Sequence, residues 1–220
     1  MATIAGNTGL EGNLSEADLG KILKNRKATA EFKILRAARL LLARHGLGVS
    51  MDAIAVEAGI SRRTLFRHFP VRDELVARAL DESLQFFHGQ VTETFETSVD
   101  LREWLRSVVS ALHSIQIGAG RGIWQLAASD DSELAAPIAA VNAKRRKARH
   151  ETTMVIAQEA WRRCGRAGMV PREVEIMFAL TFSSFAARSL NFDYGVSEEE
   201  SVRALAELLG GYLESVSTNR

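Results

Sequence analysis

Hydrophobic and polar residues follow one another along most of the chain with the three- and four-residue spacing of amphipathic helices. In the segment 26–45, an apolar stripe passes through Phe32, Leu35, Ala38, Leu42 and His45, with basic side chains away from it. No alternating run of apolar and polar residues between turn signals indicates a strand. Only three prolines interrupt the pattern. The pattern therefore predicts an all-α fold.

Breaks in the periodicity at glycines and prolines divide the chain into nine predicted helical segments. These segments are residues 26–45, 51–58, 62–69, 72–97, 101–117, 121–129, 132–164, 172–192 and 198–216. The residues before them are rich in glycine and polar side chains, so they cannot bury enough apolar surface to offset the entropy of ordering. We expect residues 1–25 to form a flexible arm.

The two short segments 51–58 and 62–69 carry the signals of a helix-turn-helix. Ser50 stands where the N-cap of the first helix belongs, Gly59 follows its last residue, and Ser61 stands at the N-cap of the second helix. Two short helices joined at a glycine turn are typical of this motif.

The second helix of the motif is expected to expose hydrogen-bond donors. Leu65 and Phe69 fall on its inward side, while the outward side holds Arg62, Arg63, Thr64, Arg67 and His68. An arginine near the start of a recognition helix can donate two hydrogen bonds to a guanine in the major groove. The pattern therefore predicts base contacts from the first two arginines and phosphate contacts from the other three residues.

The charge of the chain is unevenly distributed, although the net charge is only +1. Residues 21–80 contain thirteen Lys and Arg against five Asp and Glu, an excess expected of a surface that binds phosphate backbone. Taken singly, each basic residue is better explained as part of a solvated surface, and Arg67 by an ion pair with Asp73 or Glu74. The caps, the turn, the donor face and the charge together favour DNA binding.

The stretch ILRAARLLLARHGLGVSMDAIAVEAGISRRTLFRHFPVRDEL, residues 34–75, resembles the DNA-binding domain of the tetracycline-repressor-like (TetR) transcriptional regulators. The shared features are an alanine-rich first helix, Ala-Gly-Ile-Ser at the turn, and Thr-Leu-aromatic with His-Phe in the third helix. The resemblance implies phosphate contacts from Ser50, Thr64 and His68, base contacts from Arg62 and Arg63, and a backbone anchor at Arg72.

Two positions depart from the pattern of that family. Arg63 stands where glycine is common, which suggests a contact of longer reach. Phe66 stands where tyrosine is common and lacks the hydroxyl that would bind phosphate. The resemblance further implies a helix-turn-helix domain at residues 26–75 and a helical effector-binding and dimerisation domain at residues 76–220. For the arm at residues 1–25 two interpretations stay open, a contact with the minor groove or a solvated leader.

The segment 76–220 contains no recognisable catalytic or metal-binding pattern. Residues 118–122, GAGRG, follow no strand and are better explained as a break between two helices than as a nucleotide-binding loop. His113 and His150 are isolated, so we expect no metal site, no cofactor and no enzyme activity. Residues 144–149, KRRKAR, are expected to be a solvated or acid-paired helix face rather than a second DNA contact.

Bulky apolar side chains and three glutamines are the candidates for a pocket that binds an unknown small-molecule effector, which the resemblance implies. They are Phe86, Trp104, Val108, Leu112, Gln116, Trp124, Gln125, Gln158, Phe178 and Phe182. The alternative, that the aromatic residues are simply core, stays open for each of them.

The last two predicted helices carry more apolar surface than two terminal helices need. The candidates for a homodimer interface are Phe178, Phe182, Phe185, Leu205, Leu208, Leu209 and Tyr212. A twofold dimer would place two recognition helices one turn of DNA apart, or a multiple of that, and so predicts a palindromic operator. The alternative is that these residues pack onto their own domain.

Together these features predict a sequence-specific transcriptional regulator, a repressor that a small-molecule ligand releases from its operator. The alternatives are a helical DNA-binding protein without a ligand switch and a helical enzyme. The single cysteine, Cys164, and the lack of a signal sequence or a long apolar segment predict a cytoplasmic protein without a membrane partner.

Overall fold

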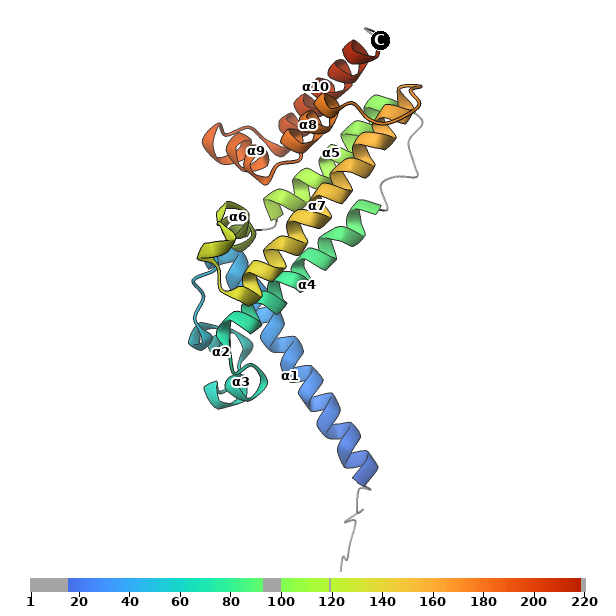
Figure 1. Cartoon of the computed structure of the whole chain (residues 1–220). Coiled ribbons are helices and arrows are strands. Elements are labelled where there is room, and N and C mark those ends of the chain that lie inside the picture. Colours follow the sequence, from blue (N-terminus) through green and yellow to red (C-terminus); the bar gives the residue numbers. More distant parts are fainter. Residues whose placement is uncertain (1–15, 93–99, 119, 219–220) are drawn as a thin grey trace, which may run out of the picture.

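The computed structural model describes residues 16–92, 100–118 and 120–218, and every regular element in these ranges is helical (Figure 1). The all-α prediction is confirmed. The elements are α1 (Glu16–His45), α2 (Met51–Ala58), α3 (Arg62–His68), α4 (Arg72–Thr92), α5 (Leu101–Gly118), α6 (Gly120–Ala128), the 3-10 helix η2 (Asp131–Glu133), α7 (Ala136–Arg163), α8 (Arg172–Thr181), α9 (Ser184–Arg188), the π-helix η3 (Ser189–Asp193) and α10 (Glu198–Thr218).

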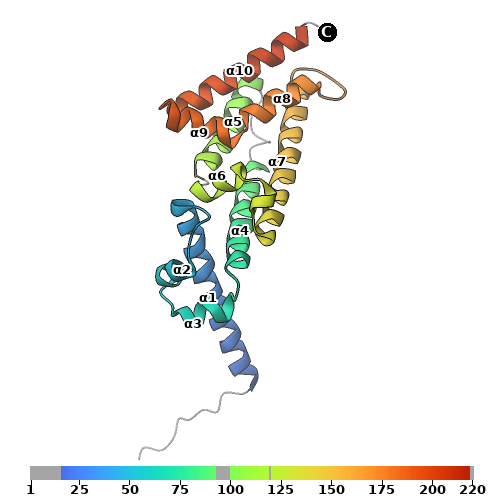
Figure 2. The ribbon, with the colours of Figure 1, turned by 60° about the vertical axis from the view of Figure 1, so that its left-hand side comes forward.

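The molecule is elongated, with its first and last helices at opposite ends (Figures 1 and 2). The helices α1, α2 and α3 form the lower end in both views, and α8, α9 and α10 form the upper end. The helices α4, α5 and α7 run between the two ends, with α4 packed against α7 and α5 packed against α10. These three helices connect the two ends, together with α6, which contacts both α1 and α9.

The first hydrophobic core joins the helix-turn-helix to the rest of the chain. Its fully buried members include Ile34, Ile54, Leu65 and Leu75 from the first four helices. The same cluster contains Ile123 and Leu126 of α6 and Ile138 and Val141 of α7. The predicted boundary at residue 75 therefore lies within one continuous core.

The second core lies at the other end of the molecule, between α5, α7, α8 and α10. Its fully buried side chains include Trp104 of α5, Ile156 of α7, Phe178 of α8 and Leu209 of α10. The Phe178 and Phe182 rings meet edge to face, with their centroids 5.6 Å apart, a geometry that aromatic pairs favour.

Three predicted helix boundaries are wrong. The first helix begins at Glu16 rather than residue 26, so residues 16–25 of the expected arm are helical, while residues 1–15 lie outside the described part. The helix predicted to start at residue 132 starts at Ala136, because Asp130 caps a separate 3-10 turn and Pro137 fits the first helical turn. The segment 172–192 is divided after Thr181, where Ser183 caps α9.

The ends of the predicted apolar stripe on α1 are also wrong, because Phe32 and His45 are exposed. The buried face of α1 is wider than the prediction and is shifted around the helix. It consists of Ile34, Leu35, Ala37, Ala38, Leu41 and Leu42.

Within the described residues, no helix is both long and apolar enough to cross a membrane.

Candidate nucleic-acid interface

Two serine caps and a glycine shape α2, α3 and the turn between them. The Ser50 hydroxyl oxygen accepts a hydrogen bond from the Ala53 N–H at 3.2 Å, and the Ser61 hydroxyl oxygen accepts one from the Thr64 N–H at 3.2 Å. Gly59 adopts φ 65°, the left-handed conformation that glycine reaches without steric cost. The predicted caps and turn are confirmed, and they fix the orientation of α3 on the domain.

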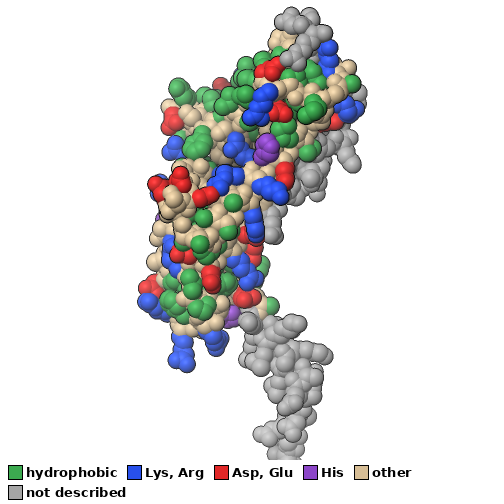
Figure 3. Space-filling view, in the orientation of Figure 1, with side chains coloured by type: hydrophobic (Ala, Val, Ile, Leu, Met, Phe, Trp, Pro, Cys, Tyr) green, Lys and Arg blue, Asp and Glu red, His purple; other side chains and the backbone are tan. Residues whose placement is uncertain are grey.

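The helix α3 places Leu65 and Phe69 in the core and its polar side chains outside. Arg62, Arg63 and Arg67 are exposed, whereas Thr64, Phe66 and His68 are half-buried. In the space-filling view, Lys and Arg side chains project from the end of the molecule that α2 and α3 occupy (Figure 3). This face therefore presents cationic donors to the solvent.

Arg62 is the arginine of α3 that is held in place by its neighbours. Its Nη1 donates to the Asp52 carboxylate at 2.9 Å, and its guanidinium lies 5.3 Å from the centroid of the Phe66 ring. An exposed ion pair of this kind contributes at most about 1 kcal/mol. The ion pair mainly fixes the position of the Arg62 side chain. Phe66 has no hydroxyl that could bind phosphate, but its ring supports the Arg62 guanidinium.

Arg63 and Arg67 are not tied down in this way. Neither forms an ion pair with any acidic residue in the described part of the chain, and the alternative pairing of Arg67 with Asp73 or Glu74 is not formed there. Both guanidiniums are therefore available to a ligand outside the domain.

The hydroxyl and imidazole groups of the predicted site lie beside these arginines. The Ser61 and Thr64 hydroxyl oxygens are 2.9 Å apart, so one hydroxyl donates to the other. Ser50 and Ser61 use their oxygens as helix caps and can still donate their hydrogens to a phosphate. The Nδ1 atom of His68 is buried, and no residue in the described part of the chain forms a hydrogen bond with it.

Arg72, which was predicted to anchor the DNA backbone, forms hydrogen bonds within the protein. Its Nε donates to the Val49 carbonyl at 2.7 Å, its Nη2 donates to the Leu47 carbonyl, and its Nη1 donates to the Asp73 carboxylate at 2.7 Å. The guanidinium is half-buried and its donors point into the protein. The structure thus makes Arg72 an internal brace between α4 and the loop before α2.

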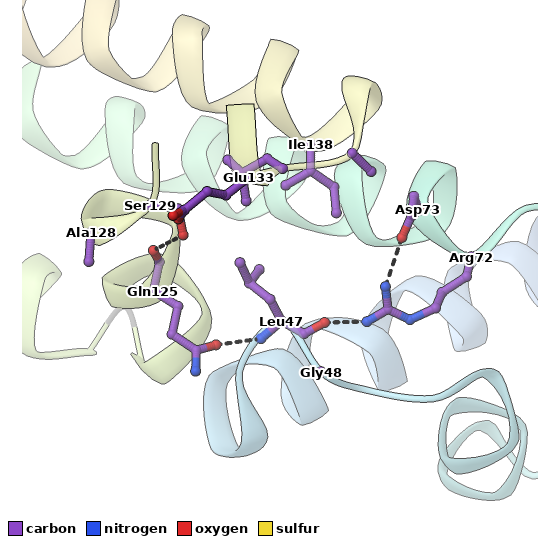
Figure 4. A pocket seen from close by; sticks show the side chains of 11 residues that line it. Leu47, Gly48, Arg72, Asp73, Gln125, Ala128, Ser129, Glu133 and Ile138 are labelled. Atoms are coloured by element: carbon purple, nitrogen blue, oxygen red, sulfur yellow. Dashed lines mark hydrogen bonds and ion pairs between the residues drawn. The ribbon is translucent and has the colours of Figure 1, made fainter. Parts of the chain in front are cut away.

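Gln125 of α6 binds the same loop that Arg72 binds (Figure 4). The Leu47 N–H donates to Gln125 Oε1 at 2.7 Å, while the Leu47 carbonyl accepts from Arg72. The peptide groups of one loop residue therefore connect α6 to the start of α4. Periodicity could not have identified this link, because it joins residues 78 positions apart.

A pocket of about 540 Å³ lies directly beside this link. It is lined by Leu47, Gly48, Arg72, Asp73, Gln125, Ala128, Ser129, Glu133, Leu134, Ala135 and Ile138. Of the ten residues predicted to line an effector pocket, only Gln125 lies here.

The other predicted pocket residues are distributed over several places. Trp104, Val108, Phe178 and Phe182 are buried in the second core, and Leu112 packs against it. Gln116 donates to the Phe182 carbonyl at 2.7 Å and accepts at its own carbonyl from the Trp124 indole.

One further member of that predicted set, Gln158, lies apart from the second core. Gln158 is exposed and donates to the Gly168 carbonyl at 3.0 Å. The side chain of Phe86 lies outside the described residues. The structure therefore groups five of the ten around the second core and separates Gln125 and Gln158 from them.

The predicted dimer residues fall into two classes. Phe178, Phe182 and Leu209 are at most 3% exposed, so the structure places them in the core of their own chain and corrects their assignment to an interface. Phe185 and Leu208 are exposed, and Leu205 and Tyr212 are half-buried. Ile176 and Leu180 of α8, which are not among the predicted interface residues, are also exposed. Hydrophobic side chains are visible over this upper end in Figure 3.

No group of three or more potential metal ligands occurs among the described residues. His113 is buried on α5, where burial lowers its pKa and the nearby Glu198 opposes that shift. The GAGRG segment contains the end of α5 and the start of α6, as predicted for a helix break.

The comparisons with known proteins agree with this geometry. Residues 34–79 match the family described as bacterial regulatory proteins, tetR family. The chain is similar in structure to a tetR-family transcriptional regulator from Streptomyces coelicolor, with 19% identity over 89% of this chain and 83% of that chain, and a TM-score of 0.62. No curated protein sequence gives a significant match.

Two further solved structures share the fold. A TetR-like transcriptional regulator from a Rhodococcus species is 19% identical over 84% of this chain and 96% of that chain, with a TM-score of 0.61. The TetR family transcriptional regulator PfmR from Thermus thermophilus is 17% identical over 80% of this chain and 96% of that chain, with a TM-score of 0.55. The resemblance predicted from the sequence is confirmed.

Proposed function

We propose that this chain, a tetR-family regulator by its DNA-binding domain and its fold, is a repressor that binds a palindromic operator as a homodimer. A small molecule bound by the helical domain then releases it from the DNA. The observation that carries the proposal is the exposed face of α3, on which Arg63 and Arg67 have no acidic partner among the described residues.

We assign a role to each α3 residue from its position along the helix and from whether its side chain already forms an ion pair in the described part of the chain. Arg63 lies at the N-terminal end of the helix, where side chains reach base edges, and its guanidinium can donate two hydrogen bonds to one guanine. Arg62 reaches the same groove from a position set by Asp52 and Phe66. Thr64, Arg67 and His68 bind phosphates on either side, together with the hydroxyls of Ser50 and Ser61.

A homodimer follows from the apolar surface at the opposite end. Leu208 of α10 is 53% exposed, and Phe185 of α9 and Leu180 of α8 are 54% and 61% exposed. Pairing with a twofold mate would cover these side chains and place two copies of α3 on successive faces of one duplex.

Ligand control requires that the two ends of the molecule be coupled. The Gln125–Leu47–Arg72 link connects α6 to the start of α4, so a ligand that moves α6 or α7 also moves the helix-turn-helix. The ligand must bind the DNA-free conformation more tightly than the DNA-bound one, typically by about 1 to 3 kcal/mol. Operator DNA must then weaken ligand binding by the same factor.

The test is a selection of random duplex DNA with the full chain at one fixed salt concentration. We expect a palindromic consensus for the native protein. Arg63→Ala should lose about 1 to 3 kcal/mol of discrimination at specific base positions. Arg162→Ala, which removes an exposed arginine of α7, is the matched control and should leave the consensus unchanged. Enrichment of no sequence, or the same consensus for Arg63→Ala, would contradict this function.

Two alternative functions would give different results in the same selection. A DNA-binding protein without a ligand switch would yield a consensus but no ligand that changes operator affinity. A helical enzyme would bind no preferred duplex.

A further inference from the structure

We propose that the effector is an organic anion, and that Arg145 and Arg149 on the inner side of α7 supply its counter-charges. The inference rests on the proposed function insofar as it takes the bound anion to be the effector.

The two arginines lie on the face of α7 that elsewhere forms core. Before them on this helix, Val141 and Asn142 are buried, and after them Thr153 and Ile156 are buried. Arg145 and Arg149 lie between these buried residues at spacings of three and four positions. Residues at such spacings lie above one another on a helix, so both arginines share the buried face. They occupy the gap between the end of the first hydrophobic core and the beginning of the second.

Neither arginine has an acidic hydrogen-bond partner among the described residues. Arg145 Nε donates to the neutral Asn142 amide oxygen at 3.0 Å, and Arg149 Nη2 donates to the Ala179 carbonyl at 3.0 Å. The Nε atom of Arg149 is buried and has no hydrogen-bond partner among the described residues. Donors of a half-buried guanidinium therefore remain available at this place.

The other basic residues of the same run behave as the sequence predicts. Lys144 lies 3.4 Å from Asp81, Arg146 donates to Asp131 at 2.8 Å, and Lys147 lies 3.9 Å from Glu151. The prediction of an acid-paired face is thus confirmed for these three. It is wrong for Arg145 and Arg149, which lie on the inner side of the helix.

The electrostatic environment of the pair is unfavourable without a ligand. Burial lowers the pKa of Arg149, and burial together with the adjacent Arg149 and Arg146 charges lowers the pKa of Arg145 to about 10. Asp131 opposes this shift, but its effect is smaller than that of burial and of the two arginine charges. Both guanidiniums stay charged at neutral pH, so two partly desolvated positive charges lie one helical turn apart.

An anion would relieve this repulsion and satisfy the free donors. The planar guanidinium matches carboxylate, sulfonate and phosphate groups, and hydrogen bonds between such charged groups are about twice as strong as neutral ones. Since the arginines lie between two hydrophobic cores, the part of the ligand that carries no charge should be apolar. The expected ligand class is therefore an amphiphilic organic anion.

The location also suits control of DNA binding. Arg149 contacts α8 through the Ala179 carbonyl, while α7 packs against α4, the helix that begins at Arg72. An anion that draws the two arginines together would change the packing of α7 between these helices.

The test compares two fluorescent dyes with nearly the same aromatic body on the full chain. Anilinonaphthalene sulfonate carries an anionic group and phenylnaphthylamine is neutral. We expect the native protein to bind the sulfonate at least about tenfold more tightly, the effect of one charge-assisted contact. The double variant Arg145→Met, Arg149→Met should lose that preference and bind the neutral dye as the native protein does.

The control is Lys147→Met, which removes one positive charge from the outer side of the same helix and should retain the preference. If the double variant does not fold by circular dichroism, Arg145→Lys with Arg149→Lys replaces it. That variant keeps both charges and should still favour the sulfonate. The proposal would be overturned if the native protein bound both dyes with equal affinity. It would also be overturned if Lys147→Met lost the preference for the sulfonate as fully as the double variant.

The DNA selection separates this outcome from that of the proposed function. A protein that selects a palindrome but does not discriminate between the dyes keeps the regulator function and overturns the anion site. A protein that discriminates between the dyes but selects no DNA keeps the anion site and overturns the regulator function.

Discussion

Single glycines set how closely α6 lies against the end of α1. Gly46 has φ 82°, and a Cβ atom at this position would lie 2.1 Å from Gln125 Oε1. Gly120 has φ 73°, and a Cβ atom there would lie 2.7 Å from the Ala43 Cα atom. Both positions need a left-handed backbone and have no room for a side chain. At the residue scale, these two glycines therefore allow the contact that supports the Gln125–Leu47–Arg72 link.

The variant Gly46→Ala should lower the free energy of unfolding by at least about 1 kcal/mol, because a non-glycine residue is strained at this φ. It should also displace the Gln125 amide and break its hydrogen bond to the Leu47 N–H. Urea denaturation followed by circular dichroism measures the change. Gly48→Ala is the matched control, since a Cβ atom at Gly48 meets nothing within 4 Å. Equal stability of the two variants would contradict this account.

At the scale of elements, the first turn of α4 connects the helix-turn-helix to the rest of the protein. Arg72 binds two carbonyl oxygens of the loop between α1 and α2 and the carboxylate of Asp73. Leu75 and Val76 follow in the same helix and are fully buried in the first core. The position of α3 on the domain thus depends on a polar brace and an adjacent apolar contact.

The variant Arg72→Met should destabilise the protein by about 1.5 to 3 kcal/mol, the value of hydrogen bonds that involve a charged group. Arg72→Lys should not restore stability, because one ammonium cannot reach three acceptors that are arranged for a planar guanidinium. Thermal unfolding compares the three proteins. Affinity for the selected operator should fall without a change in the consensus sequence. A changed consensus with full stability would instead indicate that Arg72 contacts DNA.

At the scale of the whole molecule, α3 lies at one end, and α8, α9 and α10, which carry exposed apolar side chains, lie at the other (Figure 2). The helices α4, α5 and α7 run between these ends, and the first core connects α4 to α6 and α7. A dimer formed at the upper end would therefore hold the two copies of α3 at a separation that the inclination of α4 determines. A small change in this inclination is enough to alter how the dimer fits successive grooves.

The variant Leu208→Glu should convert the proposed dimer to a monomer, because it places a charge at an exposed apolar position of α10. Light scattering after size-exclusion chromatography measures the mass, and operator affinity should fall with it. Val155→Glu makes the same kind of change at an exposed apolar residue of α7 and should remain dimeric. A dimeric Leu208→Glu protein would exclude this surface as the interface.

The sequence alone determined the features that depend on neighbours in the chain. The caps at Ser50 and Ser61 and the turn at Gly59 involve residues three or four positions away. Their residue types fix the local geometry without help from the fold. Periodicity likewise predicted helices throughout, and the charge count placed the cationic surface in the first third of the chain.

Only the tertiary structure decided which partner each exposed or apolar group meets. Periodicity identifies the face of a helix that will be buried but not the element that covers it, so Phe178, Phe182 and Leu209 fitted an interface and a core equally well. Arg72 and Gln125 find their partners 25 and 78 residues away. The run KRRKAR is divided in the same way. Arg145 and Arg149 lie on the inner side of α7, whereas Lys144, Arg146 and Lys147 lie beside acidic residues. The physical reason is that packing, and not local composition, decides which residues distant in the sequence come into contact.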